Sequence, residues 1–341
     1  MAEPAAYQPP YTVTPAIVNR IAEISEMLGR HAVLAESAAA PRLRRANRIR
    51  SIQASLEIEN NTLTIEQVTA LIEGKRVLGH PREIQEVHNT YAAYEAMESW
   101  QASEKKDFLT AHQLLMQDLV AEAGRYRNGD VGIFRGQQLV HMAPPANRVP
   151  TLIANLLTWL KNTPEHPLVS SAICHYEIEF IHPFADGNGR IGRLWQTLVL
   201  RDWKPVLAYL PIESVIRDRQ QDYYGSLALA DQRADVTPFI EFILTAIQEA
   251  VEDAIESDPV TDLVTDPVAA LLNSIGTNTL GTKEIMRALS LSHKPSFRKN
   301  YLQPALQANW IERTQPNTPT SPTQRYRLTR KGLDWLSSAG R

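Results

Sequence analysis

The sequence predicts a mainly α-helical protein that carries one β-hairpin and ends in a separate basic module. Three observations lead to this fold class. Apolar residues recur at helical spacing over most of the first 256 residues, a glycine turn lies between apolar residues near the middle of the chain, and two Asp-Pro pairs precede a tail of different charge. A chain of 341 residues fits roughly two or three domains, so its length agrees with this organisation.

The composition is that of an ordinary globular protein. The hydrophobic fraction is 43% and the charged fraction 21%, and no uninterrupted apolar stretch approaches the roughly 18 residues that a membrane-spanning helix needs. Residues 1–11 lack the basic start and the apolar centre of a secretory signal. We therefore expect a cytoplasmic protein.

Cys174 is the only cysteine of the chain, which excludes an intrachain disulfide and a zinc site built from several thiolates. It lies within an apolar stretch of helical periodicity. Because a free cysteine in such a stretch behaves as a small apolar residue, we expect a buried thiol and not a reactive one.

Helical periodicity is clear at the N-terminus, where Ile17, Ile21 and Ile24 share one face of a helix predicted over residues 14–40. Thr64 and Gln67 have the spacing of a capping box, so another helix is expected to begin there. The centre of the chain is therefore expected to be an all-α body, with further helices predicted over residues 42–59, 83–100, 149–161, 168–181, 188–202 and 211–256.

The segment 126–145 is the best strand candidate in this helical part. Apolar residues at positions 131, 133, 139 and 140 flank the sequence Arg135-Gly136-Gln137. This pattern predicts a short β-hairpin.

A boundary is predicted at residues 257–267, which contain both Asp-Pro pairs. From Val268 onward the chain has 11 Lys and Arg against 3 Asp and Glu, whereas the part before it is acidic. The tail is predicted to contain a first helix, a helix over 282–291, a turn at 292–295, a third helix over 296–309, and two strands at 310–313 and 325–328 joined by a Pro-rich loop. This order of elements is typical of a winged helix.

A polyphosphate site is predicted in the run His-Pro-Phe-Ala-Asp-Gly-Asn-Gly-Arg-Ile-Gly-Arg, which begins at His182 and ends at Arg193. Since His182 precedes a proline, its backbone is biased away from the helical region, and it is expected to end the preceding helix. Gly187 and Gly189 lack a Cβ atom, so the backbone can turn tightly and direct N–H groups outward at the start of the next helix. Arg190 and Arg193 lie three residues apart, and both are expected to project toward this anion site.

Asp186 and His182 add the groups that nucleotidyl transfer requires. Mg²⁺ usually takes one or two carboxylates together with phosphate oxygens, and Asp186 is the carboxylate nearest to the predicted phosphate site. A histidine with an ordinary pKa can act as a general base near neutral pH, so His182 could take the proton of an attacking hydroxyl.

These residues match the motif of the Fic family, His-x-Phe-x-(Asp/Glu)-Gly-Asn-Gly-Arg-x-x-Arg, at every specified position. The resemblance extends from about Pro9 to the end of the chain. It implies a mainly α, Fic-type helical core that binds ATP with Mg²⁺ and transfers AMP to a Ser, Thr or Tyr hydroxyl of a protein.

By this resemblance each motif residue has a role. His182 is the catalytic base, Asp186 is the metal ligand, and Phe184 anchors the loop in the core. The nucleotide is expected to contact the rest of the motif, with the anion cradle at Gly187, Asn188 and Gly189 and the phosphate arms at Arg190 and Arg193.

The related Doc-type kinases transfer the γ-phosphoryl group of ATP, typically carry Lys in place of the second glycine, and lack the last arginine. Gly189 and Arg193 are both present here. The motif therefore agrees with the AMP-transferring branch, although by itself it does not exclude the phosphocholine transfer of some family members.

Two further segments resemble parts of the family. Residues 126–145 resemble the flap, a hairpin that clamps an extended target segment by main-chain pairing, with an ordinary exposed hairpin as the alternative. Tyr223 and Tyr224, followed by Leu227 and Asp231, resemble the lining of the adenine pocket, with core packing as the alternative. Tyr224 is the residue that we expect at the nucleotide.

Residues 55–60 fit the inhibitory pattern of the family, (Ser/Thr)-x-x-x-Glu-(Gly/Asn), with Ser55 in the first position and Glu59 in the fifth. The resemblance implies that Glu59 pairs with Arg193 and so takes the arm that a γ-phosphate needs, because a carboxylate competes directly with a phosphate for a guanidinium group. A surface helix with scattered glutamates is the alternative, and Glu57 is the rival glutamate, but no Gly or Asn follows it.

The tail resembles the C-terminal winged helix-turn-helix domain of many Fic proteins. Lys294, Arg298 and Lys299 would lie on the recognition helix and Arg325 and Arg327 on the wing, which is compatible with DNA phosphate contacts. A solvated basic face on a protein-binding or dimerising module is the alternative.

Two functions of different classes follow. The first is a protein adenylyltransferase that Glu59 inhibits and whose protein substrates could include itself, with an N-terminal helical region (1–100), a catalytic core (101–256), a linker (257–267) and a winged-helix domain (268–341). The second is a nucleotide-sensing DNA-binding regulator without transferase activity, against which the complete motif argues. Removal of AMP by a water that Glu59 orients is a third option, and a homodimer is compatible with the family.

Overall fold

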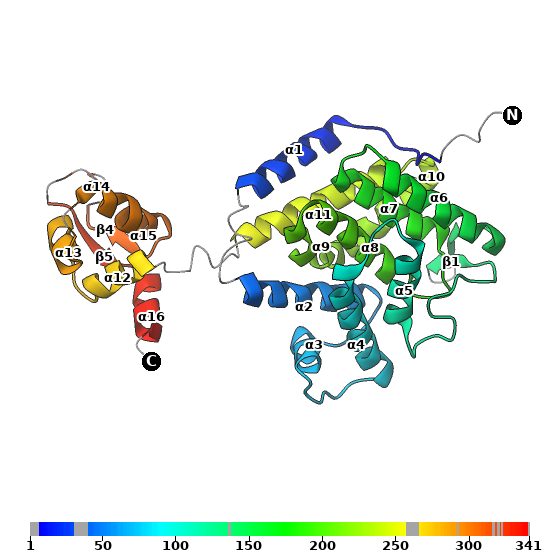
Figure 1. Cartoon of the computed structure of the whole chain (residues 1–341), viewed down its shortest axis with the longest axis horizontal. Helices are drawn as coiled ribbons and strands as arrows, with labels where there is room; N and C mark the ends of the chain where they lie inside the picture. The colour runs from blue at the N-terminus through cyan, green and yellow to red at the C-terminus, as the bar shows by residue number, and fades with distance from the viewer. Residues whose placement is uncertain are drawn as a thin grey trace. The chain divides into compact units, whose positions relative to one another are not determined.

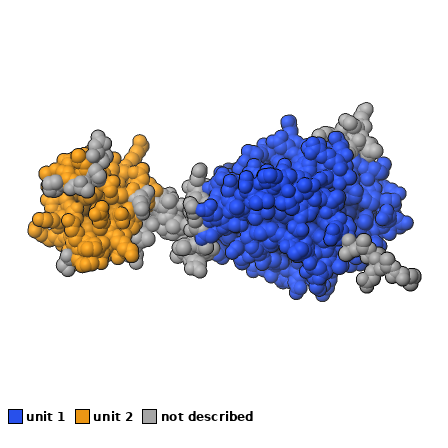
Figure 2. All heavy atoms as spheres, turned by 90° about the horizontal axis from the view of Figure 1, so that it is seen from above, with its two compact units in different colours: residues 1–257 blue, residues 258–341 orange. Residues whose placement is uncertain are grey.

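The chain forms two compact units, Met1–Ser257 and Asp258–Arg341 (Figures 1 and 2). The computed structural model describes residues 7–30, 40–135, 138–256, 266–291, 293–315 and 323–339, together with Thr318 and Ser321. Most of the predicted boundary segment 257–267 lies outside these residues. The predicted division of the first unit at residue 100 stays a prediction.

The first unit is helical apart from one hairpin, as predicted. Short 3-10 turns, η2 (Met97–Ser99), η3 (Ala146–Arg148) and η4 (Pro205–Tyr209), connect some of its elements. Its helices are α1 (Pro15–Arg30), α2 (Ala40–Ile58), α3 (Ile65–Ile72), α4 (Pro81–Ala96), α5 (Lys105–Met116), α6 (Val149–Asn162), α7 (Pro167–Ile181), α8 (Asn188–Trp203), α9 (Ile212–Asp218), α10 (Gln220–Arg233) and α11 (Thr237–Glu256).

Helices α7 and α8 form the centre of this unit and lie between the other helices in Figure 1. Both are buried on nearly all sides. Apolar residues such as Ile173, Ile178 and Leu194 make up much of the buried surface, but polar side chains such as Arg193 and Gln196 are buried as well. They are joined by a loop of six residues, 182–187, so the end of α7 lies beside the start of α8. Cys174 is fully buried in α7, as predicted, and burial raises the pKa of its thiol.

The predicted helices are found, with different boundaries at several ends. The first helix ends at Arg30, and residues 31–39 lie outside the described part. The helix predicted to reach residue 100 ends at Ala96 and continues as a 3-10 turn. The region predicted as helical over 211–256 contains three helices, because Arg219 and Ala234 leave the helical conformation. The predicted capping box opens α3, where Gln67 N donates to Thr64 Oγ1 over 3.4 Å.

Helix α5 has no counterpart among the predicted helices. Its buried residues Phe108, Ala111 and Leu115 recur at helical spacing, so the periodic signal was present in the sequence. The helix packs on α4 and α8, and its residue His112 contacts the loop between α7 and α8.

The predicted hairpin consists of β1 (Gly132–Arg135) and β2 (Gln138–Met142), which pair antiparallel with an irregularity between Ile133 and Phe134. The predicted turn residues Gly136 and Gln137 lie outside the described part. The buried guanidinium group of Arg127 ties the base of this hairpin together, because it donates to Gly129 O over 2.8 Å and also to Pro144 O.

The second unit has the element order of a winged helix, as predicted. Its buried core contains Leu271, Ile285, Phe297, Trp310 and Leu328. The strands form an antiparallel sheet in the order β3-β5-β4. The elements are α12 (Asp266–Ile275), β3 (Leu280–Gly281), α13 (Thr282–Ala288), α14 (Lys294–Phe297), the π turn η5 (Arg298–Leu302), α15 (Gln303–Gln307), β4 (Ile311–Arg313), β5 (Arg325–Leu328) and α16 (Arg330–Ala339).

Several details of this unit differ from the prediction. The helix predicted over 282–291 ends at Ala288, and the strand predicted over 310–313 begins at Ile311. The third helix begins at Lys294 and not at residue 296, because His293 Nδ1 caps it by accepting from Ser296 N over 3.3 Å. Strand β3 and helix α16 were not predicted. The two-residue strand β3 is defined only by its pairing with β5, which local sequence does not reveal.

No helix in the described residues is long and apolar enough to span a lipid bilayer.

Trp195 gives a direct test of this core. It is fully buried, with its ring 5.0 Å from that of Phe108 and 6.4 Å from that of Trp100, and its Nε1 donates to Ala102 O over 2.9 Å. Because the side chain fills space that neighbours cannot close, Trp195→Ala should lower the free energy of unfolding by about 3–5 kcal/mol in urea denaturation. Leu78→Ala is the control, since Leu78 is 94% exposed and should change the free energy by less than about 0.5 kcal/mol. Equal effects of the two variants would contradict this packing.

Candidate active site

The loop between α7 and α8 begins at His182, which ends α7 as predicted but in an unexpected conformation. Its backbone is left-handed, with φ 49° and ψ 60°, and not extended. This conformation costs a non-glycine residue about 1–2 kcal/mol. Arg127 compensates, since its Nε donates to His182 O over 2.7 Å and its backbone N donates to Pro183 O over 2.9 Å. The same arginine holds the base of the hairpin, so both segments share one anchor.

Asn188 closes the loop from the other side. Its Oδ1 accepts from Phe184 N and its Nδ2 donates to Phe184 O, each over 2.9 Å. Phe184 is fully buried, as predicted, and stacks on His112 at 3.5 Å between ring centres. The Asn188 side chain therefore shapes the loop, and only its backbone N–H is directed along the axis of α8.

His112 supports the loop at Asp186. Its Nδ1 accepts from Gly124 N over 2.9 Å, so its Nε2 carries the proton and donates to Asp186 O over 2.9 Å. Burial lowers the pKa of His112 to about 4, which keeps this neutral arrangement at pH 7.

The start of α8 is an open anion site. The first N–H groups of a helix have no partner within the helix, and the helix dipole adds positive potential there. Gly187 has φ 82°, which a side chain would disfavour. A Cβ atom on Gly189 would lie 2.3 Å from Glu59 Oε1, so only glycine leaves room for an acidic group above this helix end.

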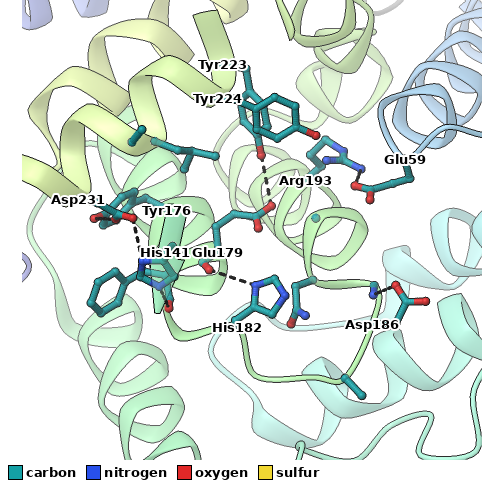
Figure 3. Close-up of a pocket in the computed structure, with 17 residues that line it drawn as sticks. Glu59, His141, Tyr176, Glu179, His182, Asp186, Arg193, Tyr223, Tyr224 and Asp231 are labelled. Carbon is teal, nitrogen blue, oxygen red and sulfur yellow. Dashed lines mark hydrogen bonds and ion pairs between the residues drawn. The ribbon is translucent and has the colours of Figure 1, made fainter. Parts of the chain in front are cut away.

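Glu59 fills that position and pairs with Arg193. Arg193 is 2% exposed, and its Nη2 donates to Glu59 Oε1 over 2.8 Å. Its Nε donates to Ser55 Oγ and its Nη2 also donates to Ser55 O, each over 3.0 Å. The three residues that the inhibitory pattern and the motif single out therefore meet at one point. Figure 3 shows the pair of Glu59 and Arg193.

A pocket of about 290 Å³ lies above the start of α8. It brings together most of the predicted residues: Glu59, His182, Asp186, Gly187, Asn188, Gly189, Arg193 and Tyr224. Figure 3 shows the side chains of Glu59 and Arg193 on one side, Tyr224 above, and His182 below. Ser55 lies behind Arg193, outside the lining.

Arg190 also lies outside the lining of this pocket, although the motif spacing suggested that it projects toward the anion site. It is 3% exposed, and its guanidinium group lies 3.4 Å from both Glu86 Oε1 and Asp186 Oδ1. Three residues along a helix leave the two arginines only about 60° apart in direction, so helix geometry alone does not separate them. Arg190 lies nearer the start of α8, where Glu86 of α4 is its partner, whereas Arg193 pairs with Glu59 and lines the pocket. Its role as a phosphate arm stays a prediction.

Asp186 is held by hydrogen bonds from several directions. Its Oδ1 accepts from Gly187 N over 2.6 Å, and its Oδ2 accepts from Arg82 Nη2 over 3.0 Å. Among the described residues no group of three or more His, Cys, Asp or Glu side chains could hold a metal by itself. A single half-exposed carboxylate beside an anion site fits Mg²⁺, which takes its other ligands from water and phosphate.

The protonation state of His182 differs from the expectation of an ordinary pKa. Burial lowers its pKa to about 4, and the positive charges of His141 and Arg127 act in the same direction. Its Nδ1 faces Glu179 O at 3.4 Å, and a carbonyl oxygen can only accept, so Nδ1 carries the proton. The neutral ring therefore has its lone pair on Nε2.

The far end of the pocket joins Asp231, which the sequence analysis placed at the predicted adenine pocket, to His141 and Tyr176, which it missed. His141 from β2 donates to Asp231 from α10 over 2.8 Å and to Phe180 O over 2.8 Å. Burial opposes its protonation, but these acceptors raise its pKa overall, and Tyr176 donates to the same Asp231 over 2.6 Å. These residues come from three separate elements, so no local pattern could have joined them.

Glu179 is a further carboxylate of the pocket that the sequence analysis missed, although the sequence contained a signal that could have identified it. It precedes His182 by three residues and is an acidic residue inside an apolar helix. Burial raises its pKa to about 7, while its Oε1 lies 3.2 Å from Tyr223 Oη. Tyr223 is fully buried, and Tyr224 beside it faces the pocket.

Two family descriptions match the sequence. "Fic/DOC family" matches residues 102–200, and "Filamentation induced by cAMP protein Fic-like, C-terminal domain" matches residues 266–329. Similar named proteins include "Protein adenylyltransferase Fic" from Aedes aegypti, 30% identical over 210 residues, and from Drosophila erecta, 30% identical over 217 residues. These alignments cover 57% and 59% of this chain but only 39% and 41% of the two relatives.

A solved structure is similar over nearly the whole chain. The crystal structure of a Fic family protein from Desulfovibrio desulfuricans G20 is 68% identical, covers 96% of this chain and 99% of that chain, and has a TM-score of 0.72. Fic-1 from C. elegans shares the fold, with 22% identity, 72% and 74% of the two chains covered, and a TM-score of 0.58. With the complete motif at the start of α8, this agreement shows that the chain belongs to the Fic family.

Proposed function

We propose that the protein is an adenylyltransferase that moves AMP from ATP to a Ser, Thr or Tyr hydroxyl of a protein. The observation that carries this proposal is the pocket at the start of α8, where the lone pair of His182 Nε2, the free helix N–H groups and Arg193 face one cavity. The relatives named as protein adenylyltransferases support it.

His182 acts as the base in this reaction. Its Nε2 takes the proton of the attacking hydroxyl while the hydroxyl oxygen forms a bond to the α-phosphorus of ATP. The bond from that phosphorus to the bridging oxygen breaks, and pyrophosphate leaves. The N–H groups at the start of α8 stabilise the negative charge, which they can do without reorganisation.

Asp186 is the residue that would hold Mg²⁺, which when bound would neutralise charge on the phosphates. Arg82 Nη2 donates to the same carboxylate over 3.0 Å, so Asp186 already has a cationic partner. Tyr224 is proposed to face the adenine at the opposite side of the pocket.

Glu59 is proposed to keep the enzyme inactive. Its carboxylate occupies the space above Gly189 and takes Nη2 of Arg193, the donor that an outer phosphate of ATP would use. A carboxylate at this place also repels a polyphosphate, so ATP binds productively only after Glu59 moves.

The hairpin β1–β2 is proposed to bind the target. An extended target segment can add to a strand edge by main-chain hydrogen bonds, which depends little on its sequence. The anchor at Arg127 keeps the base of this hairpin close to His182.

A DNA-binding role of the second unit is the alternative function. Lys294, Arg298 and Lys299 are exposed on one helical segment, which favours contact with phosphates. Arg325 and Arg327 are paired with Glu284 over 3.4 Å and Glu312 over 2.6 Å, so the wing offers less free positive charge. A homodimer and a cytoplasmic location stay predictions from the sequence.

The first prediction concerns transfer and its inhibition. With α-labelled ATP and Mg²⁺, Glu59→Gly should raise AMP incorporation into protein about tenfold or more, since a hydrogen bond to a charged group contributes about 1.5–3 kcal/mol. His182→Ala in either background should lower incorporation by about 10²- to 10⁴-fold, because the base is lost.

Two controls distinguish the transferase from the DNA-binding regulator. ATP binding should survive His182→Ala, since the ring is not part of the phosphate cradle. Absence of incorporation in every variant would reject the transferase and favour the DNA-binding role.

The second prediction concerns the protonation of His182. Because burial lowers its pKa in the folded protein to about 4, an NMR titration of the imidazole should show a midpoint near pH 4, with the neutral form throughout pH 5–8. His182→Asn assigns the signal. A midpoint at pH 6 or above would mean that the ring is not desolvated as described.

The third prediction concerns Asp186. In the presence of ATP, Asp186→Asn should weaken binding of Mn²⁺, a spectroscopic substitute for Mg²⁺, as measured from the free-ion signal in electron paramagnetic resonance. Asp202→Asn, which removes a surface carboxylate paired with Arg201, serves as the control. Unchanged binding in Asp186→Asn would exclude this residue as a ligand.

A further inference from the structure

Glu59 lies just after the end of a helix and is not held within a helix. Helix α2 ends at Ile58, and Glu59 lies in the turn that follows, where its N donates to Leu56 O over 3.0 Å. Asn60 is left-handed, with φ 68°, and reverses the chain. Because helix ends fray, something outside α2 has to hold this turn.

Helices α9 and α10 supply that support through two polar contacts. Arg217 Nη1 donates to Gln53 Oε1 over 3.0 Å and to Glu57 Oε2 over 3.1 Å. Gln220 Nε2 donates to Ile58 O over 3.1 Å, and so caps the last carbonyl of α2. Gln53 also donates to Glu57 over 3.0 Å, so the pair Arg217–Glu57 is part of a small network on the last two turns of α2.

Helix α9 is itself firmly placed. Glu213, four residues before Arg217, is 2% exposed and accepts from Ser51 over 2.8 Å, from Tyr94 over 2.7 Å and from Thr197 over 3.3 Å. These partners belong to α2, α4 and α8. Residues four apart lie on the same helix face, so Arg217 faces α2 as Glu213 does, one turn further along α9. There it contacts the end of α2.

We propose that Arg217 is a positioning residue for Glu59. By clamping Glu57, two residues earlier, it holds the last turn of α2 so that the Glu59 carboxylate stays on Arg193. Arg217 touches neither the pocket nor Arg193, and thus acts only through the position of the turn. This inference rests on the proposed inhibition by Glu59 and extends it to a site outside the pocket.

The clamp is half-exposed, and this sets the size of the expected effect. The Arg217 side chain is 29% exposed and that of Glu57 46%. An ion pair of this kind contributes at most about 1 kcal/mol, which corresponds to a change of about fivefold in the balance between the docked and the released turn.

The test compares Arg217→Ala and Glu59→Gly, alone and combined, by AMP incorporation. Arg217→Ala should raise incorporation about fivefold in the unaltered chain and leave it unchanged in the Glu59→Gly background. Arg219→Ala is the matched control, because Arg219 makes a partly exposed ion pair over 2.6 Å with Glu249 of α11, not with α2, and should have no effect. An equal increase in both backgrounds would overturn the proposal, as would no increase where Glu59→Gly activates.

Two further measurements keep the inference separate from the proposed function. The charge exchange Glu57→Arg with Arg217→Glu should restore inhibition, which a general loss of stability would not explain. Hydrogen exchange of the amides at 57–61 should be faster in Arg217→Ala than in the unaltered chain, whether or not AMP is transferred. Unchanged exchange would reject the clamp itself, whereas faster exchange without any effect of Glu59→Gly would reject the proposed inhibition.

Discussion

The buried guanidinium group of Arg193 is the constraint on which the site depends. A charge that is 2% exposed has to be compensated by hydrogen bonds and an opposite charge, since leaving it unpaired would be strongly destabilising. Ser55 from α2 and Glu59 from the turn after this helix provide the compensation, and both lie more than a hundred residues away from Arg193 in the sequence. Packing of α2 against α8 is therefore required by the same charge that a nucleotide phosphate would contact.

This arrangement is the physical basis of the proposed inhibition, in which Glu59 and a nucleotide phosphate compete for Arg193. Nη2 of Arg193 donates to Ser55 O and to the Glu59 carboxylate, and of these two acceptors the carboxylate is the one that lies in the pocket, above Gly189. A phosphate can satisfy the buried charge equally well, because both groups present oxygen atoms to a guanidinium group. The proposed inhibition thus rests on two alternative partners for one cation, and the proposed clamp at Arg217 acts on the balance between them.

A second constraint comes from Arg127, which positions the base. Its guanidinium group donates hydrogen bonds to carbonyl groups at the end of α7 and at the base of the hairpin. The same side chain therefore holds both the strained backbone of His182 and the hairpin. His112 and Asn188 complete the support of the loop. The loop is therefore fixed by buried groups before any ligand binds, which is the preorganisation that a transferase needs.

How much could be predicted from the sequence differs between fold and site. The helices of the first unit were predictable because their apolar residues follow a period of 3.6. The helix ends near Arg30, Arg219 and Ala234 were not predictable, because the periodic pattern does not show where the backbone leaves the helical conformation. The predicted meeting of Glu59 with Arg193 is found, since it followed from a specific motif. Arg190 lies outside the lining of the pocket although the motif spacing suggested that it faces the anion site, because spacing along a helix does not determine which neighbour a side chain reaches.

The sequence by itself determined the fold class, the family and the set of residues at the start of α8, because these are properties of local periodicity and of a short contiguous motif. The tertiary structure decided the protonation of His182, the second carboxylate at Glu179, the link between His141 and Asp231, and the clamp at Arg217. Each of these depends on burial or on partners from distant segments. Burial changes the charge state of a group, and packing against segments distant in the sequence selects its partner. The residues next to the group in the sequence determine neither.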